Sequence, residues 1–324
     1  MSEADPRLPW GAPPLAETRT NAQRKRKYRA TDPAEAYVQC RCARPDCWTR
    51  GLLPLREHIA ALFRAIASLG YYERFPQYER CDDPWPGVIY GLQMAASLDD
   101  LFADPSYVTG DEAGFWCDAA WQREEEDREL ASKYAAALIT FNFAWNAYEA
   151  AIEISAEGMF PKDKIPVRAR RLFQAEQGEA AKIQAFEVSF RVARHICSHQ
   201  CSLKNEIDSI GEKYGLSGAG AAAELVRIFR NYIVHGNDPL PAHDDWPCFR
   251  FYAITRVMLL LTQYLVLRKV PNPEYSVFIY AMQEDHGSAP ADLYMRNLHY
   301  SRSVWPLNGY QAELALGEET ARTT

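Results

Sequence analysis

The chain has 324 residues, 48% of them hydrophobic, and a formal net charge of −7 at pH 7. This composition is normal for a soluble globular protein, and the length suffices for one large domain or two modest ones. The negative charge argues against a protein that coats duplex DNA or long RNA non-specifically, so any contact with nucleic acid must come from a small, local basic site.

The cysteines and the N-terminal residues bear on the cellular compartment. Eight cysteines in a chain of this length do not form the dense framework of a small secreted domain. Residues 1–15 are polar and proline-rich, and they lack the apolar segment of a signal peptide. We therefore expect a cytoplasmic protein with reduced thiols.

The first third of the chain divides into a tail and a helical region. Residues 1–36 are rich in Pro, Ala, Thr and charge without apolar periodicity, which predicts a disordered tail. The basic run from Arg24 to Arg29 within it is either a solvated charge run or a weak RNA-tethering arm. Residues 37–110 are expected to form an N-terminal helical region, with apolar side chains at helical spacing from Leu55 to Ile66 and a further helix over 87–102.

Residues 111–272 are expected to form the main helical bundle. A long helix over 111–157, which a kink could interrupt, begins acidic and then carries a wide apolar stripe made of Tyr134, Leu138, Phe141, Trp145, Tyr148 and Ile152. Further helical segments are expected at 164–176, 179–201, 202–215, 219–234 and 247–267. The last of these is the most apolar, but arginines near its centre favour a buried core helix over a membrane span.

The C-terminal extension, residues 273–324, has a weaker pattern. Residues 275–282 fit either a strand or a helix, and the polar end of the chain is expected to fray. The sequence contains no internal repeat and no alternating β-pattern of any length. The expected fold class is therefore all-α, with a helical bundle at its centre.

The helix expected at residues 219–234 has two faces when its residues are placed at about 100° intervals. The apolar face, expected to point to the core, comprises Ala222, Leu225, Val226, Ile228, Phe229, Tyr232 and Ile233. The opposite arc comprises Glu224, Arg227, Arg230, Asn231 and Val234. His235 borders this arc beside Asn231, about 140° from Arg230 on a regular wheel. Arg230 and His235 therefore meet only if the helix unwinds at Gly236 or if a second subunit supplies one of them.

The residue types at the end of this helix can support cleavage of RNA. Gly236 follows His235, and Asp238-Pro239 comes two residues later, which is a strong signal for a helix end. The negative end of the helix dipole favours a protonated imidazole, so His235 can serve as both acid and base near neutral pH. Arg230 can hold a phosphate through two parallel hydrogen bonds. Because the 2′-hydroxyl of RNA is an internal nucleophile, neither a metal nor a protein nucleophile is required.

The segment Arg230-Asn231-x-x-x-His235 at a helix end resembles the Arg-x4–6-His motif of the HEPN superfamily, in which Asn frequently follows the arginine. The resemblance covers roughly residues 130–270. It implies an HEPN-like helical bundle, here with additional N-terminal helices and short irregular termini. It also implies a homodimer that joins two motifs, and metal-independent endoribonuclease activity that leaves 2′,3′-cyclic phosphate ends. Many family members are toxins or antiphage effectors, so an antitoxin or sensor partner is expected as well.

On this resemblance, Arg230, His235 and Asn231 are the expected catalytic residues, and Arg230 and Arg227 are expected to bind RNA. Glu149, on the long helix, could orient His235 or pair with Arg230, or it could be an ordinary polar position. A second match to the spacing, Arg194 to His199, is expected to lie inside a helix and is therefore disfavoured. The alternatives to an enzyme are a non-catalytic helical module that binds RNA, a nucleotide or a protein, and a structural subunit of a larger assembly.

Metal and cofactor sites are not expected. Cys40, Cys42 and Cys47 have the wrong spacing for a usual zinc site and would need Cys81 or His58 as a fourth ligand. The pairs His195/His199 and Cys197/Cys201 point about 160° apart on a helix, so they cannot share one ion. The chain also lacks a Gly-rich phosphate loop, a His-Glu-x-x-His segment and a Gly-x-Ser-x-Gly segment.

Overall fold

The computed structural model describes residues 47–66, 85–99, 101–109, 117–238, 246–270, 276–279, 287–301 and 304–305. Within these ranges the regular structure is helical apart from one two-stranded antiparallel sheet. The predicted all-α class is therefore confirmed. The tail expected at residues 1–36, with its basic run, lies outside the described residues.

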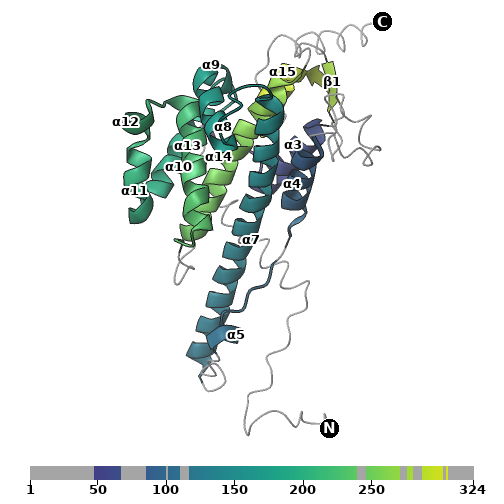
Figure 1. The fold of residues 1–324 in the computed structure, drawn as a ribbon. Coiled ribbons are helices and arrows are strands. Elements are labelled where there is room, and N and C mark those ends of the chain that lie inside the picture. The colour runs from purple at the N-terminus through teal and green to yellow at the C-terminus, as the bar shows by residue number, and fades with distance from the viewer. Residues whose placement is uncertain are drawn as a thin grey trace, which may run out of the picture.

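The elements are labelled along the chain in Figure 1. The N-terminal ones are α3 (Leu55–Ile66), α4 (Trp85–Ser97), α5 (Ser106–Thr109) and α7 (Asp118–Ser155). The middle of the chain forms α8 (Ile165–Ala175), α9 (Gln177–Ala180), α10 (Phe186–Ser198), α11 (Cys201–Asp208), α12 (Ile210–Tyr214) and α13 (Gly218–Val234). The C-terminal part forms α14 (Trp246–Arg268), β1 (Ser276–Ile279), β2 (Gly287–Pro290) and α15 (Ala291–Asn297).

Helix α7 is the axis of the molecule. It runs through 38 residues as one continuous helix, which is about 57 Å at 1.5 Å per residue. Helices α3 and α4 lie on one side of it and α8 to α14 on the other, while its N-terminal end, with α5, projects beyond the bundle (Figure 1). The acidic side chains in the first turns of α7 are half-buried or exposed, and its apolar second half is buried.

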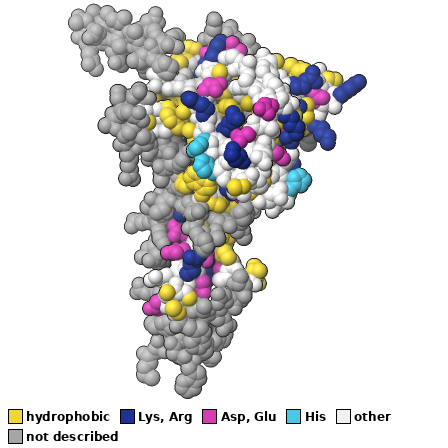
Figure 2. All heavy atoms as spheres, turned by 90° about the vertical axis from the view of Figure 1, so that its left-hand side faces the viewer, with side chains coloured by type: hydrophobic (Ala, Val, Ile, Leu, Met, Phe, Trp, Pro, Cys, Tyr) yellow, Lys and Arg dark blue, Asp and Glu magenta, His cyan; other side chains and the backbone are white. Residues whose placement is uncertain are grey.

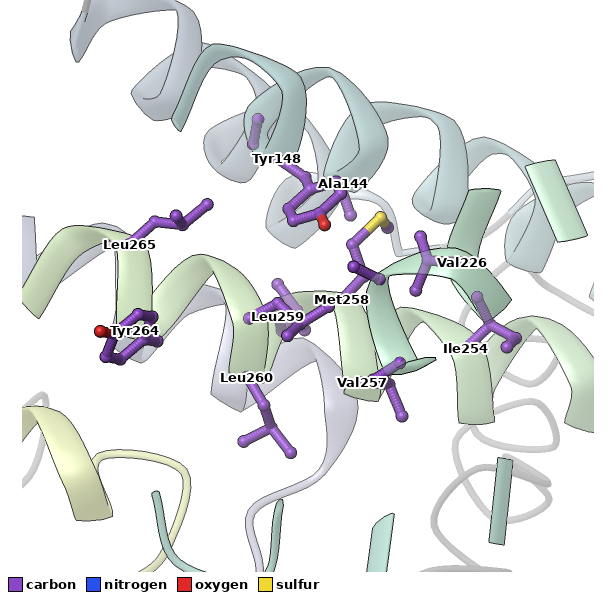
Figure 3. Close-up of a cluster of buried hydrophobic side chains, with 14 of the residues drawn as sticks. Ala144, Tyr148, Val226, Ile254, Val257, Met258, Leu259, Leu260, Tyr264 and Leu265 are labelled. Carbon is purple, nitrogen blue, oxygen red and sulfur yellow. The ribbon is translucent and has the colours of Figure 1, made fainter. Parts of the chain in front are cut away.

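The core forms where α7, α13 and α14 meet. Figure 3 shows Ala144 and Tyr148 of α7 directed toward Met258 of α14, with Val226 of α13 beside it. The apolar stripe predicted on the long helix is buried except for Leu138, which is half-buried. The position of the long helix in the core therefore follows from its apolar period.

Helix α14 is enclosed by the bundle along most of its length. By length and composition alone it could cross a membrane, and 94% of its most apolar window is buried inside the fold. Arg250 and Arg256, which disfavoured a membrane span in the sequence, are both buried and hydrogen-bonded. The predicted core helix is therefore observed.

One segment differs from the sequence expectation, and a second adopts one of the two structures that the sequence allowed. The helix expected at 179–201 is interrupted, because Ala185 adopts a left-handed φ of 56° between α9 and α10. At 275–282, where strand and helix both fitted, residues 276–279 form a strand. The C-terminal extension also contains α15, whose buried Tyr294 and Met295 belong to the same core cluster as Leu55 of α3.

Gly91 allows α4 to approach α7 closely. A Cβ atom at Gly91 would lie 2.7 Å from the carbonyl oxygen of Phe143 and 2.9 Å from the backbone N of Ala147. We expect Gly91→Ala to destabilise the fold by about 1–3 kcal/mol through overpacking, despite the higher helix propensity of alanine. The measurement is the urea midpoint of unfolding. Gly178→Ala on α9 is the matched control, since nothing lies within 4 Å of its added Cβ, and equal effects at the two sites would contradict the prediction.

Candidate functional site

Helix α13 ends where the sequence predicts. His235 is its C-cap residue, and Gly236 follows with a left-handed φ of 68°. The N–H of Gly236 donates to the carbonyl of Ile233 at 2.9 Å, and the N–H of Asn237 donates to that of Tyr232 at 3.2 Å. These two bonds form a Schellman motif, which a glycine at this position favours. His235 is therefore exposed at a fixed helix end.

The competing match at Arg194 to His199 is not inside a helix, so that expectation is wrong. Helix α10 ends at Ser198, and His199 is its C-cap residue. The Nδ1 atom of His199 lies 2.9 Å from the carbonyl oxygen of His195, to which it can donate, and a short i→i−3 bond from Gln200 to Cys197 closes the turn. Both matches thus lie at helix ends. They differ in the left-handed glycine, which only the match at His235 has.

Arg230 faces helix α7. Its guanidinium carbon lies 5.5 Å from the ring centroid of Trp145, a cation–π arrangement. Partial burial raises the pKa of Glu149, one turn further along α7, while the Trp145 indole and the Arg230 charge both act against this rise. The indole N–H is nevertheless buried without a hydrogen bond of ordinary geometry. Of the two roles that the sequence left open for Glu149, proximity to Arg230 is the one with a structural basis.

Asn231 and His235 face the opposite way, into a pocket of about 310 Å³ between α13 and the α11–α12 segment. Arg227 lines the same pocket, as do Ser202, Ser209 and Lys213. Arg230 is not among the lining residues. Three of the predicted site residues are therefore together in this pocket, whereas Arg230 and Glu149 lie at the α7 side of α13.

The geometry of α13 decides between two ways of joining Arg230 and His235. The helix is regular through Val234, so unwinding does not bring the two side chains together. Five residues of α-helix separate their directions by about 140°. Within one chain, the motif therefore presents its arginine and its histidine on different sides. A shared site needs a second copy of the chain.

Glu224 is the clearest departure from the helical-wheel expectation. The helical wheel places Glu224 on the polar arc, away from the core, but its side chain is fully buried. The reason is tertiary, because α8 covers this arc of α13 and brings Arg170 to 3.4 Å from the Glu224 carboxylate. Arg227, one turn along α13, donates to both carboxylate oxygens at 3.0 and 3.1 Å. Two guanidinium groups thus neutralise a buried carboxylate, as burial of a charge requires.

A second buried ion pair supports the turn after His235. The carboxylate of Asp238 accepts hydrogen bonds from Arg250 of α14 and, at 2.9 Å, from the hydroxyl of Tyr134 of α7. The side chains of Asp238 and Arg250 are 2% and 3% exposed. Burial raises the pKa of Asp238, and Arg250 opposes that rise. From the sequence, Asp238 is recognised only as part of a helix-end signal. Its role in an ion pair is not predicted, because the ion pair forms through tertiary packing with α14 and α7.

The cysteines expected not to bind metal are only partly described. Cys40, Cys42 and Cys81 lie outside the described residues. Among the residues that the structure describes, no three His, Cys, Asp or Glu side chains form a group that could hold a metal ion. Cys197 is buried and Cys201 is exposed.

No protein-family model, no curated protein and no solved structure matches the chain.

Proposed function

We propose that this protein is an HEPN-type, metal-independent endoribonuclease that acts as a symmetric homodimer. The observation that carries the proposal is the end of α13, where a left-handed glycine leaves His235 exposed beside Asn231 and Arg227 in a polar pocket. The all-α bundle around this helix is consistent with the proposal. The expected compartment is the cytoplasm, and the expected role is that of a toxin or antiphage effector controlled by an antitoxin or sensor partner.

In the proposed reaction, His235 accepts the proton of the ribose 2′-hydroxyl as the 2′-oxygen attacks the adjacent phosphorus. The P–O5′ bond breaks, the leaving 5′-oxygen takes up a proton, and a 2′,3′-cyclic phosphate remains. Arg230 binds the phosphate and stabilises the negative charge that develops on its oxygens. Asn231 orients the phosphate or the imidazole. Because Arg230 and His235 diverge within one chain, each site pairs Arg230 of one protomer with His235 of the other.

Surface character favours a second copy of the chain at this helix end. Val234, between Ile233 and His235, is 56% exposed. Single exposed apolar side chains are common on protein surfaces, but an interface that covered Val234 would remove its apolar area from water. A C₂ dimer would bring the same helix end from both protomers together.

Cleavage of total RNA in the presence of EDTA tests the chemistry. We expect the wild-type protein to generate 2′,3′-cyclic ends, and Arg230→Ala and His235→Ala each to slow cleavage by about 10²-fold or more. Arg194→Ala and His199→Ala, the corresponding changes in the competing match, serve as controls and should cleave normally. Cleavage that persists in the Arg230 and His235 variants, or that EDTA abolishes, would contradict the proposal.

Mixing the two inactive variants tests the shared site. After subunit exchange, a heterodimer of Arg230→Ala and His235→Ala chains has one site with both residues intact. A mixture of equal parts should therefore recover about a quarter of the wild-type rate. A mixture that stays inactive while mass measurement shows heterodimers would mean that both residues act from one chain.

The separation of Arg230 from His235 also favours a second candidate, a non-catalytic helical module that binds RNA through the same pocket. This alternative predicts RNA binding without turnover, and unchanged binding in His235→Ala. A stable monomer that binds RNA would favour it over the endoribonuclease.

A further inference from the structure

The pocket beside His235 is built around a fixed cationic cluster. Glu224, which is fully buried and does not line the pocket, holds the lining residue Arg227 through three donor–acceptor contacts of 2.6, 3.0 and 3.1 Å. Arg170 of α8 adds a fourth at 3.4 Å. Two arginines therefore share one carboxylate, and the cluster keeps an excess positive charge. The buried carboxylate of Glu224 fixes the position of the Arg227 guanidinium. This group is therefore oriented before any ligand binds.

Helix α12 adds a third cation and an aromatic ring to this cluster. The guanidinium carbon of Arg170 lies 4.5 Å from the ring centroid of Tyr214, and the Nζ atom of Lys213 lies 5.1 Å from it. Lys213 is exposed, Tyr214 is half-buried, and both line the pocket. Figure 2 shows the side of the molecule on which α11 and α12 lie, where Lys and Arg side chains are interspersed with Asp and Glu side chains in the upper part.

The rest of the lining combines neutral hydrogen-bonding groups with His235, one acid and the apolar side chains of Leu203 and Ile228. Ser202, Ser209 and Asn231 line the pocket, and the Tyr232 hydroxyl is buried near Ser202 and Asp238 without a hydrogen bond of ordinary geometry. Glu206, which is exposed, is the one carboxylate among the residues that line the pocket. The pocket thus offers cations for a phosphate and hydroxyl and amide groups for a sugar. Its volume of about 310 Å³ lies within the usual range for small-molecule sites.

We infer that this pocket is a subsite for the phosphodiester and ribose next to the cleaved bond of single-stranded RNA, with Arg227 and Lys213 as the phosphate ligands. The inference rests on the proposed endoribonuclease function, because His235, which lines the pocket, would then act on the neighbouring phosphate. Arg227 provides the directional, preoriented contact and Lys213 the mobile one. Glu206 opposes the phosphate charge and weakens binding.

Binding of a fluorescent 2′-O-methyl oligoribonucleotide, which cannot be cleaved, tests the subsite on the full chain. We expect Lys213→Gln to weaken binding by about tenfold, the effect of one charged hydrogen bond. It should also lower the slope of log affinity against log salt by about 0.7, the value for one phosphate contact with a single strand. Glu206→Gln should strengthen binding. Lys204→Gln is the matched control, because Lys204 is exposed on α11 but pairs with Asp208 outside the pocket.

Arg227→Gln should weaken binding at least as much as Lys213→Gln. This change also leaves the buried Glu224 carboxylate with Arg170 as its remaining cation, which can impair folding. The double variant Glu224→Gln/Arg227→Gln avoids the unpaired charge. Lys213→Gln carries the test if neither of these variants folds. Equal affinity and salt slope for Lys213→Gln, Lys204→Gln and the wild-type protein would overturn the subsite.

Cleavage of unmodified RNA separates this inference from the proposed function. Pocket-dependent binding without any cleavage would leave the subsite in place and overturn the endoribonuclease. Cleavage that depends on Arg230 and His235, but that has the wild-type KM in Lys213→Gln, would support the endoribonuclease and overturn the subsite. If the oligoribonucleotide does not bind at all, the subsite is overturned, and a protein partner becomes the occupant to test.

Discussion

Replacing Arg250 by methionine is expected to lower the free energy of unfolding by about 3–5 kcal/mol, because it leaves the buried charge of Asp238 without its partner. Both side chains are almost fully buried, and Arg250 also donates to Gln200 at 3.1 Å. The loss should be measured by urea denaturation near neutral pH. A loss below about 1 kcal/mol, the usual range of exposed pairs, would contradict a tightly coupled buried pair.

The double variant Arg250→Met/Asp238→Asn supplies the control. It removes both charges, and the asparagine oxygen can still accept the hydrogen bond from Tyr134. We expect it to be more stable than Arg250→Met alone, so that the double-mutant cycle shows a coupling energy. If the double variant loses the sum of the two single losses, the two groups act independently.

Acidity should partly rescue Arg250→Met. Burial raises the pKa of Asp238 even with Arg250 present, and the rise must grow when the opposing cation is removed. A carboxyl whose pKa is higher in the folded than in the unfolded chain contributes stability that grows as pH falls. The deficit of Arg250→Met relative to the wild-type protein should therefore shrink between neutral pH and about pH 5. A deficit independent of pH would show that Asp238 is not its cause.

Loss of stability on acidification is the second large expected effect. Its cause is a chain of buried side chains that links α3, α14 and the segment directly after α15. His58 Nε2 donates to Gln263 Oε1 at 3.0 Å, and His58 Nδ1 accepts from Arg256 at 3.0 Å. Gln263 Nε2 in turn donates to His299 Nδ1 at 3.2 Å, and His299 Nε2 donates to the carbonyl of Gln184 at 2.8 Å. Each histidine thus has one donating and one accepting nitrogen, so the chain requires both to be neutral.

Burial reinforces this requirement. It lowers the pKa of His58 well below its ordinary value, with Arg256 and His299 acting in the same direction. It lowers the pKa of His299 to about 3, where the bond to Gln184 acts against the shift and Arg256 adds to it. Burial also lowers the pKa of Arg256 to about 10, so this side chain remains a cation at neutral pH and disfavours a second charge beside it.

The unfolded chain takes up a proton at each of these histidines near pH 6.5, whereas the folded chain takes up none at His299 until about pH 3. Stability contributed by the neutral histidines is therefore present above pH 6.5 and is lost as the pH falls toward 3. The expected loss is roughly 1.4 kcal/mol per pH unit for each histidine. Urea unfolding between pH 7.5 and about 5 measures it before most carboxylates titrate.

His299→Gln keeps a donor for the Gln184 carbonyl and should reduce this pH slope by about one proton. His195→Gln is the control, because His195 is exposed at the end of α10 and takes no part in the buried chain. A wild-type slope in His299→Gln would show that the buried histidines are not the source of acid sensitivity.

Local patterns were sufficient to predict several elements of the fold. The three- and four-residue spacing from Tyr134 to Ile152 predicts the buried face of α7, and the glycine after His235 predicts the end of α13. The apolar run around Met258 predicts a core helix. These features depend on helical period and on backbone preference, which are properties of neighbouring residues. The 140° angle between Arg230 and His235 also follows from helix geometry alone.

The surroundings of each side chain were decided only by the tertiary structure. Glu224 lies on the polar arc of its helix, but it is buried because α8 supplies Arg170. His58 gave no signal of its own, since its partners Arg256 and Gln263 are 198 and 205 positions away. Arg230 turns to α7 and His235 to the α11–α12 pocket, because packing of other helices determines the surroundings of each arc. Sequence by itself therefore determined the helices and the direction of their residues, whereas long-range packing decided which charges are buried, paired or open to a ligand.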